Sequence, residues 1–412
     1  MYFYKKVKNE YITMNNKRND KSVTILSHDK CLSCRSCEQT CPVNAIAMKE
    51  SFEGFLYPEE NDACINCGLC VKHCPVLSPV IVKNTARKNY VAWIKDEKKL
   101  GQSTSGGMFT AFAEECINNG GTVFGSAFDK ELNPFQALAE NTKDLIPMKG
   151  SKYVESDTRK SFSEVRQLLN AGRMVLYSGT PCQVAGLRAY LGKEYDNLLT
   201  IDLICHGVPS RKIFKKYLEW MGKKLGEKII YIGFRDKDVG GWSCGGKTKT
   251  KTKTKTIDGI NDPYYWSFLH CETYRESCYG CPYADIKNRP ADITIGDFFE
   301  VEKIYPEVER TKGVSLLILN TKKGCETFEN IKEKLNILPI KTEQYLSLKD
   351  NLVKPSPRPN KRDTVYKNID SISLGALMSL LKAPFALRLK MRIIKFVPRS
   401  IKTQIKKIIG KK

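Results

Sequence analysis

The chain has no apolar run as long as the ~18 residues that a membrane-spanning helix needs. Residues 1–22 also lack the apolar core of a signal peptide. Disulfides are typical of exported proteins, so a disulfide framework is disfavoured for the 16 cysteines of this sequence. We therefore expect a cytoplasmic protein in which the cysteines stay reduced and bind metal.

Acidic residues are absent from residues 372–412, which carry eleven lysines and arginines. The Lys-Thr repeat of residues 247–256 adds five lysines. These two segments hold most of the formal net charge of +23, and no nucleic-acid-binding motif is visible elsewhere, so binding of nucleic acid is disfavoured. We interpret the repeat as a loop insertion because it has no apolar residue to dock on a core. Its threonines also permit a solvated β-hairpin.

Two cysteine runs near the N-terminus share the spacing C-x2-C-x2-C-x3-C-P and are separated by 22 residues. This spacing is typical of bacterial ferredoxins with two [4Fe–4S] clusters, in which the fourth cysteine of each run ligates the other cluster. The pattern predicts a dicluster module over residues 23–80 that transfers single electrons. One cluster takes Cys31, Cys34, Cys37 and Cys74, and the other takes Cys64, Cys67, Cys70 and Cys41.

Zinc is the main alternative to iron–sulfur clusters, because four-thiolate zinc sites also use C-x2-C pairs. Zinc gives no reason for the third cysteine of each run, or for the prolines that follow the fourth, Pro42 and Pro75. We therefore favour the clusters. We expect residues 1–22 to be a polar tail and Ser22–Leu26 to form the first strand of the module.

Between residues 85 and 345, short apolar runs alternate with amphipathic helical patterns. Strands separated by such helices predict an α/β (α+β) catalytic core with a mixed, partly parallel sheet. The expected strands are Tyr90–Ile94, Thr122–Phe128, Arg173–Ser178, Leu198–Ile204, Lys228–Phe234, Asp292–Gly296 and Val314–Leu319, and the expected helices are Gly107–Asn118, Arg159–Asn170, Gln183–Leu191, Arg211–Lys224 and Cys325–Leu335.

A proline-rich segment, residues 346–371, is interpreted as a linker to a basic amphipathic C-terminal tail, residues 372–412. In this tail apolar residues recur at helical spacing, with basic residues elsewhere on the helical wheel. Such a pattern is typical of peripheral contact with an anionic membrane. Packing of the tail on its own domain or on a partner is the alternative.

An enzyme that receives single electrons needs a cofactor that pairs them, and flavins do this. The segment Ser103–Met108 (STSGGM) leads into a predicted helix whose N-terminus suits a flavin phosphate, although an ordinary helix cap is the alternative. Lys152 in the string GSKYV could meet a phosphate or face water.

Four cysteines outside the N-terminal module lie in loops at strand and helix ends, where ligands can converge. They are candidates for a third [4Fe–4S] cluster, with buried inert thiols as the alternative. Cys182 begins a predicted helix, and the dipole of a helix lowers the pKa of a thiol at its N-terminus. The four are Cys182, Cys205, Cys278 and Cys281, with Cys271 in reserve, whereas Cys116, Cys244 and Cys325 are interpreted as ordinary thiols.

Together these motifs resemble one family, the coenzyme F420 hydrogenase/dehydrogenase beta-subunit family. Members bind FAD and an additional [4Fe–4S] cluster, and they pass electrons between iron–sulfur carriers and an organic hydride acceptor, which is a deazaflavin coenzyme in the type members. The layout with the dicluster module first is similar to a branch associated with bacterial polysaccharide gene clusters. The resemblance rests on STSGGMFTA (103–111), GSKYVES (150–156), LYSGTPCQVAGLRAYL (176–191), LLTIDLICHGVPS (198–210), FRDKDVGGWS (234–243), SCYGCPYA (277–284) and ADITIGDFF (291–299).

The resemblance implies that the third cluster takes the four loop cysteines and that residues 85–345 bind FAD. Asp297, after a predicted strand, becomes the candidate catalytic residue, because a carboxylate there could orient the isoalloxazine ring or exchange a proton; a helix cap is the alternative. The candidate flavin contacts are Ser103, Thr104, Ser105, Gly106, Gly107, Lys152, Gly179, Thr180 and Gln183.

The sequence therefore predicts an FAD- and [4Fe–4S]-dependent oxidoreductase. We expect electrons to pass from a ferredoxin or another redox protein, through the clusters and FAD, to a deazaflavin coenzyme or another organic acceptor. The alternatives are a non-catalytic protein that only delivers electrons to a partner enzyme and an iron–sulfur scaffold of a glycan-assembly complex.

Overall fold

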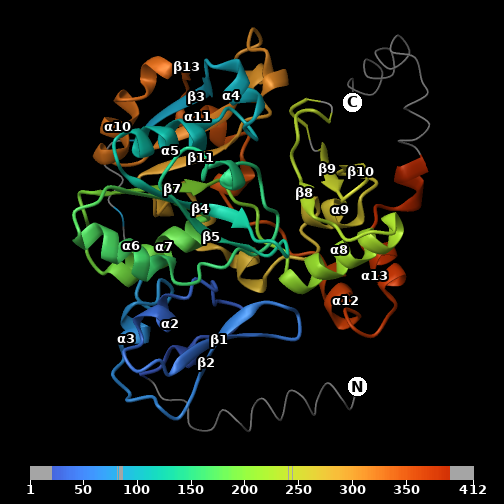
Figure 1. The fold of residues 1–412 in the computed structure, drawn as a ribbon, viewed down its shortest axis with the longest axis horizontal. Coiled ribbons are helices and arrows are strands. Elements are labelled where there is room, and N and C mark those ends of the chain that lie inside the picture. The colour runs from blue at the N-terminus through green and yellow to red at the C-terminus, as the bar shows by residue number, and fades with distance from the viewer. Residues whose placement is uncertain (1–20, 81, 83–86, 240, 244, 390–412) are drawn as a thin grey trace.

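The computed structural model describes residues 21–80, 82, 87–239, 241–243 and 245–389, which form three parts (Figure 1). The N-terminal module lies against one side of a large central domain. A lobe with its own three-stranded sheet lies beside that domain.

The central domain is built on an eight-stranded sheet, which confirms the α/β core predicted from the sequence. Four strands in its middle run parallel, and antiparallel strands flank them on both sides. In the order of the sheet the strands are β13 (Leu335–Pro339), β3 (Lys88–Ile94), β12 (Ser315–Leu319), β11 (Ile293–Asp297), β7 (Leu198–Leu203), β6 (Val175–Gly179), β4 (Thr122–Phe128) and β5 (Pro134–Ala139).

Helices cover both faces of this sheet because its strands carry apolar side chains on both sides. Leu176 of β6 packs in one core with residues of α5 and α10, whereas its neighbour Tyr177 packs on the opposite face with residues of α6 and α7. Strands buried on both faces read as nearly continuous apolar runs, which is why the sequence located them. The helices of the domain are α4 (Glu97–Gly101), α5 (Met108–Asn118), α6 (Ser161–Asn170), α7 (Pro181–Leu191), α10 (Lys322–Glu329) and α11 (Thr342–Leu346).

The N-terminal module contains an antiparallel hairpin and two short helices. The segment Ser22–Leu26 forms a 3-10 turn, so the strand predicted there is wrong. The Val23 amide donates to the Cys70 sulfur at 3.3 Å instead of joining a strand ladder. The elements are η1 (Val23–Ile25), α2 (Ser36–Thr40), β1 (Ile46–Glu50), β2 (Leu56–Glu60) and α3 (Leu69–Lys72).

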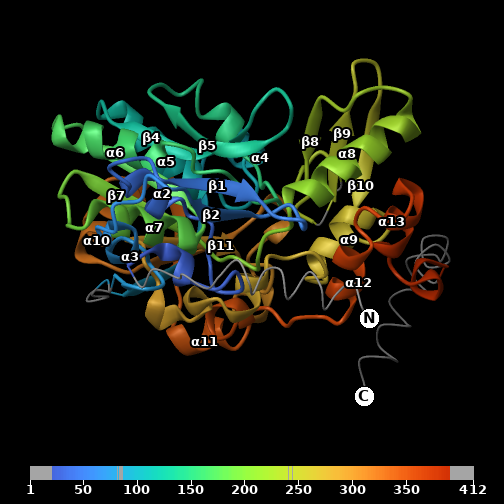
Figure 2. The same ribbon diagram turned by 90° about the horizontal axis from the view of Figure 1, so that it is seen from below.

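In the lobe, the Lys-Thr repeat forms most of an antiparallel β-hairpin, so its interpretation as a loop insertion is wrong (Figure 2). Strand alternation explains the difference: Thr248 is buried and donates to the Tyr231 carbonyl oxygen at 3.0 Å, while Lys249 and Lys253 are exposed. The elements of the lobe are β8 (Tyr231–Gly233), β9 (Gly245–Lys249), β10 (Thr254–Asp258), α8 (Arg211–Leu225), α9 (Pro263–Leu269), α12 (Lys361–Lys367) and α13 (Leu374–Leu380).

Residues 346–371 are packed against the protein, so the predicted linker is also wrong. Tyr366 of α12 is buried in the core of the lobe. The buried Arg362 forms an ion pair with Glu53 of the N-terminal module at 2.6 Å and another with Glu276 at 3.1 Å. Its Nε donates to the Tyr274 carbonyl oxygen at 2.8 Å. This segment therefore joins all three parts of the protein.

The remaining predicted strands and helices agree with the structure apart from their ends, whereas α13, inside the predicted tail, is packed in the core of the lobe. The helix predicted at Cys325–Leu335 is α10, which ends at Glu329 because Leu335 begins β13. Residues 390–412, with the second amphipathic segment of the tail, lie outside the described residues. Within the described part of the chain, none of the helices is both long enough and apolar enough to cross a bilayer.

Candidate iron–sulfur sites and redox centre

The inner cavity of the N-terminal module is lined by one predicted cysteine set, Cys31, Cys34, Cys37 and Cys74. All four cysteines are buried. A [4Fe–4S] cluster needs four thiolates around one cavity, so the residues present fit the cluster that the spacing predicts.

The outer cavity is lined by the other predicted set, Cys41, Cys64, Cys67 and Cys70. The Ala45 amide donates to the Cys41 sulfur at 3.2 Å, and hydrogen bonds of this kind adjust the potential of a bound cluster. Unlike the inner set, this set includes an exposed cysteine, Cys67. The outer cavity is therefore the one closer to solvent.

The two cysteine runs share a backbone geometry that curves each loop around its cavity. In the first run, Ser33 and Arg35 on either side of Cys34 have φ angles of 57° and 61°. In the second run, Asn66 and Gly68 have φ angles of 57° and 72° at the same two positions. Left-handed backbone is uncommon for residues other than glycine, so its repetition at Ser33, Arg35 and Asn66 indicates a structural requirement of the loop.

The four candidate cysteines of the central domain form a third group. Burial, and then the nearby Cys182 and Cys281 thiols, raise the pKa of Cys205 to about 12. Burial and the other three thiols raise the pKa of Cys278 well above its ordinary value. The group draws on the start of α7, the end of β7 and the loop that contains η3 (Glu276–Gly280).

The expected low pKa of Cys182 is wrong: burial raises it to about 11, which outweighs the helix dipole. Metal ligation would offset this cost, because iron binds the deprotonated thiol. Within the described residues, no three His, Cys, Asp or Glu side chains lie close enough together to hold a single metal ion. A [4Fe–4S] cluster has room for wider spacing, because each thiolate binds a different iron.

Helix α7 brings the third group against the inner cavity. Cys182 lies in its first turn, and Gly186 lies one turn later on the same face. A Cβ atom on Gly186 would lie 2.6 Å from the Cβ and 2.9 Å from the sulfur of Cys34. The Cys34 and Cys182 thiols are also within electrostatic range of each other. One helix therefore carries Cys182 of the third group and contacts Cys34 of the inner set.

Side chains of α2 and α3 hold the N-terminal module in this position. The Gln39 Oε1 atom accepts hydrogen bonds from the Phe162 and Ser163 amides at the start of α6, at 3.1 and 3.2 Å. His73 Nδ1 lies 2.6 Å from the Ala189 carbonyl oxygen at the end of α7. These contacts fix the module at both ends of the α6–α7 pair.

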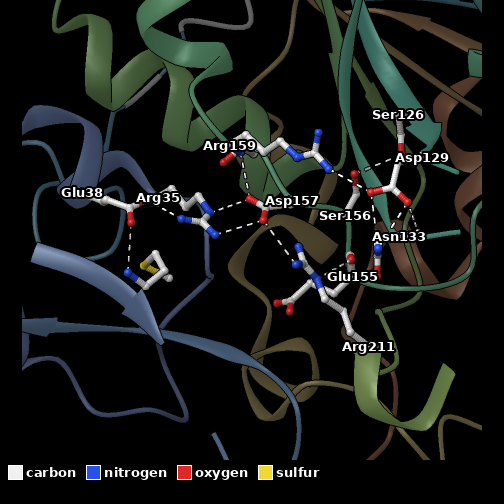
Figure 3. A network of polar contacts seen from close by, with 12 residues as sticks. Arg35, Glu38, Ser126, Asp129, Asn133, Glu155, Ser156, Asp157, Arg159 and Arg211 are labelled. Atoms are coloured by element: carbon white, nitrogen blue, oxygen red, sulfur yellow. Dashed lines mark hydrogen bonds and ion pairs between the residues drawn. The ribbon is translucent and has the colours of Figure 1, made fainter. Parts of the chain in front are cut away.

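A network of ions continues this contact into the central domain (Figure 3). Arg35 pairs with Glu38 of its own helix and, at 2.5 Å, with Asp157 of the central domain. Arg211 at the start of α8 reaches the same carboxylate at 3.2 Å. Burial acts to raise the pKa of Asp157, but the guanidinium groups of Arg211 and Arg35 hold it below its ordinary value.

The predicted flavin loop, Ser103 to Gly107, is already bonded to the protein. Ser103 Oγ donates to the Lys99 carbonyl oxygen at 2.8 Å. Ser105 Oγ donates to the Val314 carbonyl oxygen at 2.8 Å, and the Gly106 amide donates to Ser315 Oγ at 3.0 Å. These bonds join the loop to neighbouring strands, which is a structural role. No bond of Thr104 is described.

The other predicted flavin contacts are also engaged. Lys152 Nζ donates to the carbonyl oxygens of Pro147, Met148, Lys149 and Gly150 at 2.9–3.1 Å. Gln183 accepts from the Thr180 amide at 3.0 Å in a capping box of α7, and Gly179 leaves no space for a Cβ atom beside Gln183. These residues shape the loops, and their assignment as flavin contacts stays a prediction.

Unpaired polar atoms lie instead around Asp297, the last residue of β11. Arg235, which the sequence analysis did not select, pairs with the Asp297 Oδ2 atom at 2.8 Å and is almost fully buried. Arg235 Nε and Nη2 and Asp297 Oδ1 have no hydrogen-bond partner among the described residues. Buried polar groups are rarely left unpaired, so these atoms suit a ligand. The position of Arg235 in the string FRDKDVGGWS was the available signal.

This ion pair and the third cysteine group lie at the same edge of the sheet. Strands β7 and β11 are parallel, with Leu203 opposite Ile295, and the Ile204 amide donates to the Ile295 carbonyl oxygen at 2.9 Å. Cys205 and Asp297 therefore follow at the same edge of the sheet. Ligand sites of α/β sheets are typically found at this carboxyl edge.

Two family models match regions of this chain. Residues 172–343 match the family model for the C terminus of the beta subunit of coenzyme F420 hydrogenase/dehydrogenase, and residues 30–78 match a 4Fe-4S dicluster domain. Both matches confirm the resemblance and the dicluster module predicted from the sequence.

One curated protein and one solved structure are also similar to this chain. The F subunit of the F(420)H(2) dehydrogenase from Methanosarcina mazei is 24% identical over 217 residues, which are 48% of this chain and 61% of the relative's length. A chain in the structure of the F420-reducing [NiFe] hydrogenase complex from Methanosarcina barkeri superposes with a TM-score of 0.44 at 18% identity, over 70% of this chain and 95% of that chain.

The α7 contact leads to a first prediction. In Gly186→Val, the new side chain would meet Cys34, so we expect the inner site to lose iron or to move away from the third site. Iron content per chain and the magnetic coupling between clusters, seen by electron paramagnetic resonance, measure this. Gly375→Val on α13 is the control, because no atom lies within 4 Å of its Cβ position. Unchanged iron and coupling in Gly186→Val would contradict the predicted contact.

Proposed function

For a chain that joins a 4Fe-4S dicluster domain to the C-terminal domain of the coenzyme F420 hydrogenase/dehydrogenase beta-subunit family, we propose an FAD- and [4Fe–4S]-dependent oxidoreductase. It passes electrons between a ferredoxin-like carrier and an organic two-electron acceptor. When bound, the clusters supply one-electron steps and FAD supplies the two-electron step. The proposed acceptor is a deazaflavin coenzyme or a substrate of polysaccharide biosynthesis.

The observation that carries this proposal is the succession of three four-cysteine groups from the surface to the sheet edge. The outer cavity contains the exposed Cys67, and the inner cavity is buried. The contact of Gly186 with Cys34 joins the inner cavity to the third group, which includes Cys182. Cys205 of that group and Asp297 follow their strands at the same edge of the sheet. The outer Cys70 thiol is within electrostatic range of the inner Cys74 thiol.

Arg235 and Asp297 at the sheet edge supply the polar groups that could bind an organic ligand. Arg235 offers a positive charge and two donor nitrogens without a partner among the described residues, which would favour an anionic ring edge such as that of a reduced flavin. Asp297 offers a free carboxylate oxygen that could accept a hydrogen bond. Arg235 also lies over the Phe299 ring, 4.9 Å from its centre, which limits its movement. We propose that these residues hold the polar edge of the FAD ring.

The surface around the outer cavity has features that favour docking of a protein partner. Ile65 and Val43, which line this cavity, are 60% and 37% exposed. Exposed apolar residues beside an exposed ligand, Cys67, suit brief docking of a ferredoxin or a similar carrier. We further propose that the protein is cytoplasmic, where such carriers are available.

Iron and flavin content provide the first test of the proposal. We expect anaerobically purified protein to contain FAD and about twelve irons per chain, four for each cluster. Cys182→Ala removes a ligand of the third group only, so iron should fall to about eight with the two N-terminal clusters kept. Cys325→Ala is the control, because that thiol lies on α10 outside the three groups.

The same preparation separates the alternatives. Clusters without flavin, in protein that takes up no added FAD, would favour a protein that only delivers electrons or a scaffold. An iron content near eight that Cys182→Ala leaves unchanged would exclude the third cluster.

Arg235 provides a separate test of the flavin position. In Arg235→Met the charge and the free N–H groups are lost, so we expect FAD content to fall at least about tenfold, a loss of ~1.4 kcal/mol in binding. Iron content should stay as in the wild type. Arg310→Met is the matched control, since Arg310 is a half-exposed arginine paired with Glu302. Full FAD occupancy in Arg235→Met would place the flavin elsewhere.

A basic surface near the C-terminal end supports peripheral contact with an anionic membrane. Lys224 lies within electrostatic range of both Lys255 and Lys382, and Arg388 lies within range of Lys382. Phe385 and Leu389 nearby in sequence are 69% and 45% exposed. Cations beside exposed apolar groups suit an anionic lipid surface.

Vesicle binding tests this contact. We expect the protein to sediment with phosphatidylglycerol vesicles and not with phosphatidylcholine vesicles, and to be released by high salt. Replacing the three lysines with glutamine should weaken binding by about tenfold or more, at ~1 kcal/mol for each charge. Equal binding to both kinds of vesicle, or none to either, would contradict the proposal.

A further inference from the structure

Arg275 is a buried cation at the boundary between the N-terminal module and the central domain, and its side chain is 2% exposed. Its Nε donates to the carbonyl oxygen of Cys31, a ligand of the inner site, at 2.8 Å. Its Nη2 donates to the Leu56 carbonyl oxygen of β2 at 2.9 Å. Two of its three donor nitrogens thus hold the N-terminal module.

The backbone of Arg275 holds the third site. Its amide donates to the carbonyl oxygen of Val208, three residues after Cys205, at 2.9 Å. Its carbonyl oxygen accepts from the Cys278 amide at 3.0 Å. A single residue therefore bonds to a ligand of the inner site through its side chain and to a ligand of the third site through its main chain.

The charge of Arg275 is balanced by one carboxylate. Glu155 Oε1 accepts from Arg275 Nη1 at 2.9 Å, and this pair is buried on both sides. The guanidinium carbon also lies 4.1 Å from the centre of the Tyr57 ring, which fixes its orientation. The Cys31, Cys182 and Cys278 thiols all lie within electrostatic range of this cation.

We propose that Arg275 is a positioning residue that holds the inner and third cysteine groups together and raises the reduction potentials of the clusters they bind. The inference rests on the proposed function, because it requires clusters at both sites.

The sign of the effect follows from charge. Reduction adds one electron to a cluster and breaks no bond, so the reduced form carries one more negative charge. A fixed cation stabilises that form more than the oxidised form, and burial weakens the screening by water. The Glu155 carboxylate must act in the opposite direction. The distance from Glu155 to each cluster determines how much of the electrostatic effect of Arg275 is cancelled.

Three variants separate this electrostatic role from a purely structural one. Arg275→Gln should move the potentials of the inner and third clusters downward, and Glu155→Gln should move them upward. The expected size is about tenfold in the reduction equilibrium, or about 59 mV for one electron. The double variant should return close to the wild type, because both charges are gone. Redox titration followed by electron paramagnetic resonance measures each cluster, with the outer cluster as an internal reference.

A matched control and a conservative variant complete the test. Arg188→Gln also removes a buried arginine, one paired with Asp292 at 3.2 Å on α7, and should leave the potentials unchanged. Arg275→Lys keeps the charge but loses the fork geometry, so the potentials should stay high while the coupling between the two clusters weakens.

The outcomes distinguish this inference from the proposed function. Wild-type protein with fewer than about twelve irons would contradict the proposed function. Wild-type protein with three clusters, whose potentials move in the same direction in Arg275→Gln and Glu155→Gln or do not move, would contradict the role of Arg275 alone. If Arg275→Gln does not fold, Glu155→Gln and the double variant still decide the sign.

Discussion

The position of the N-terminal module depends on one close approach, that of the Cys34 loop and the following α2 to helix α7. Gly186 allows it because any side chain there would occupy the space of Cys34. The contact is made rigid at both ends, by Gln39 at the start of α6 and by His73 at the end of α7. The position of the N-terminal module on the central domain is thus inseparable from the spacing of the inner and third cysteine groups.

The boundary that maintains this contact is built largely from buried ions rather than from apolar side chains alone. Arg35 of the N-terminal module pairs with Asp157 of the central domain, and Arg362 of the lobe pairs with Glu53 of the module. Arg275, which pairs with Glu155 inside the central domain, donates across the boundary to the Cys31 and Leu56 carbonyl oxygens. Buried ion pairs contribute little net stability, because desolvation offsets their attraction, but loss of one partner is costly. Such pairs therefore fix a single arrangement of the parts. They also place permanent charges close to the cysteine groups, which apolar packing could not do.

The sequence predicted features that short motifs encode and missed contacts between residues that lie far apart in the chain. The spacing of the cysteine runs was sufficient to assign both N-terminal sets, because the crossing of the fourth ligand belongs to the motif itself. The bond between Arg35 and Asp157 joins residues 122 positions apart, and that between Arg362 and Glu53 joins residues 309 apart. No short pattern records such pairs, so the proline-rich segment resembled a linker. The Lys-Thr repeat was misread for the same reason, since its buried threonines need β8 as a neighbour.

The parallel register of β7 and β11 explains why the third cysteine group and the Arg235–Asp297 pair are neighbours. Each strand ends at the same edge: β7 ends at Leu203, two residues before Cys205, and β11 ends at Asp297. In parallel strands this edge is where side chains from separate loops converge, so the four cysteines and the ion pair share it without extra structure. Arg235 arrives from the lobe, after β8, and its bond to Asp297 joins the lobe to the same edge. The sheet therefore determines where both groups of residues lie, and the lobe supplies the positive charge beside Asp297.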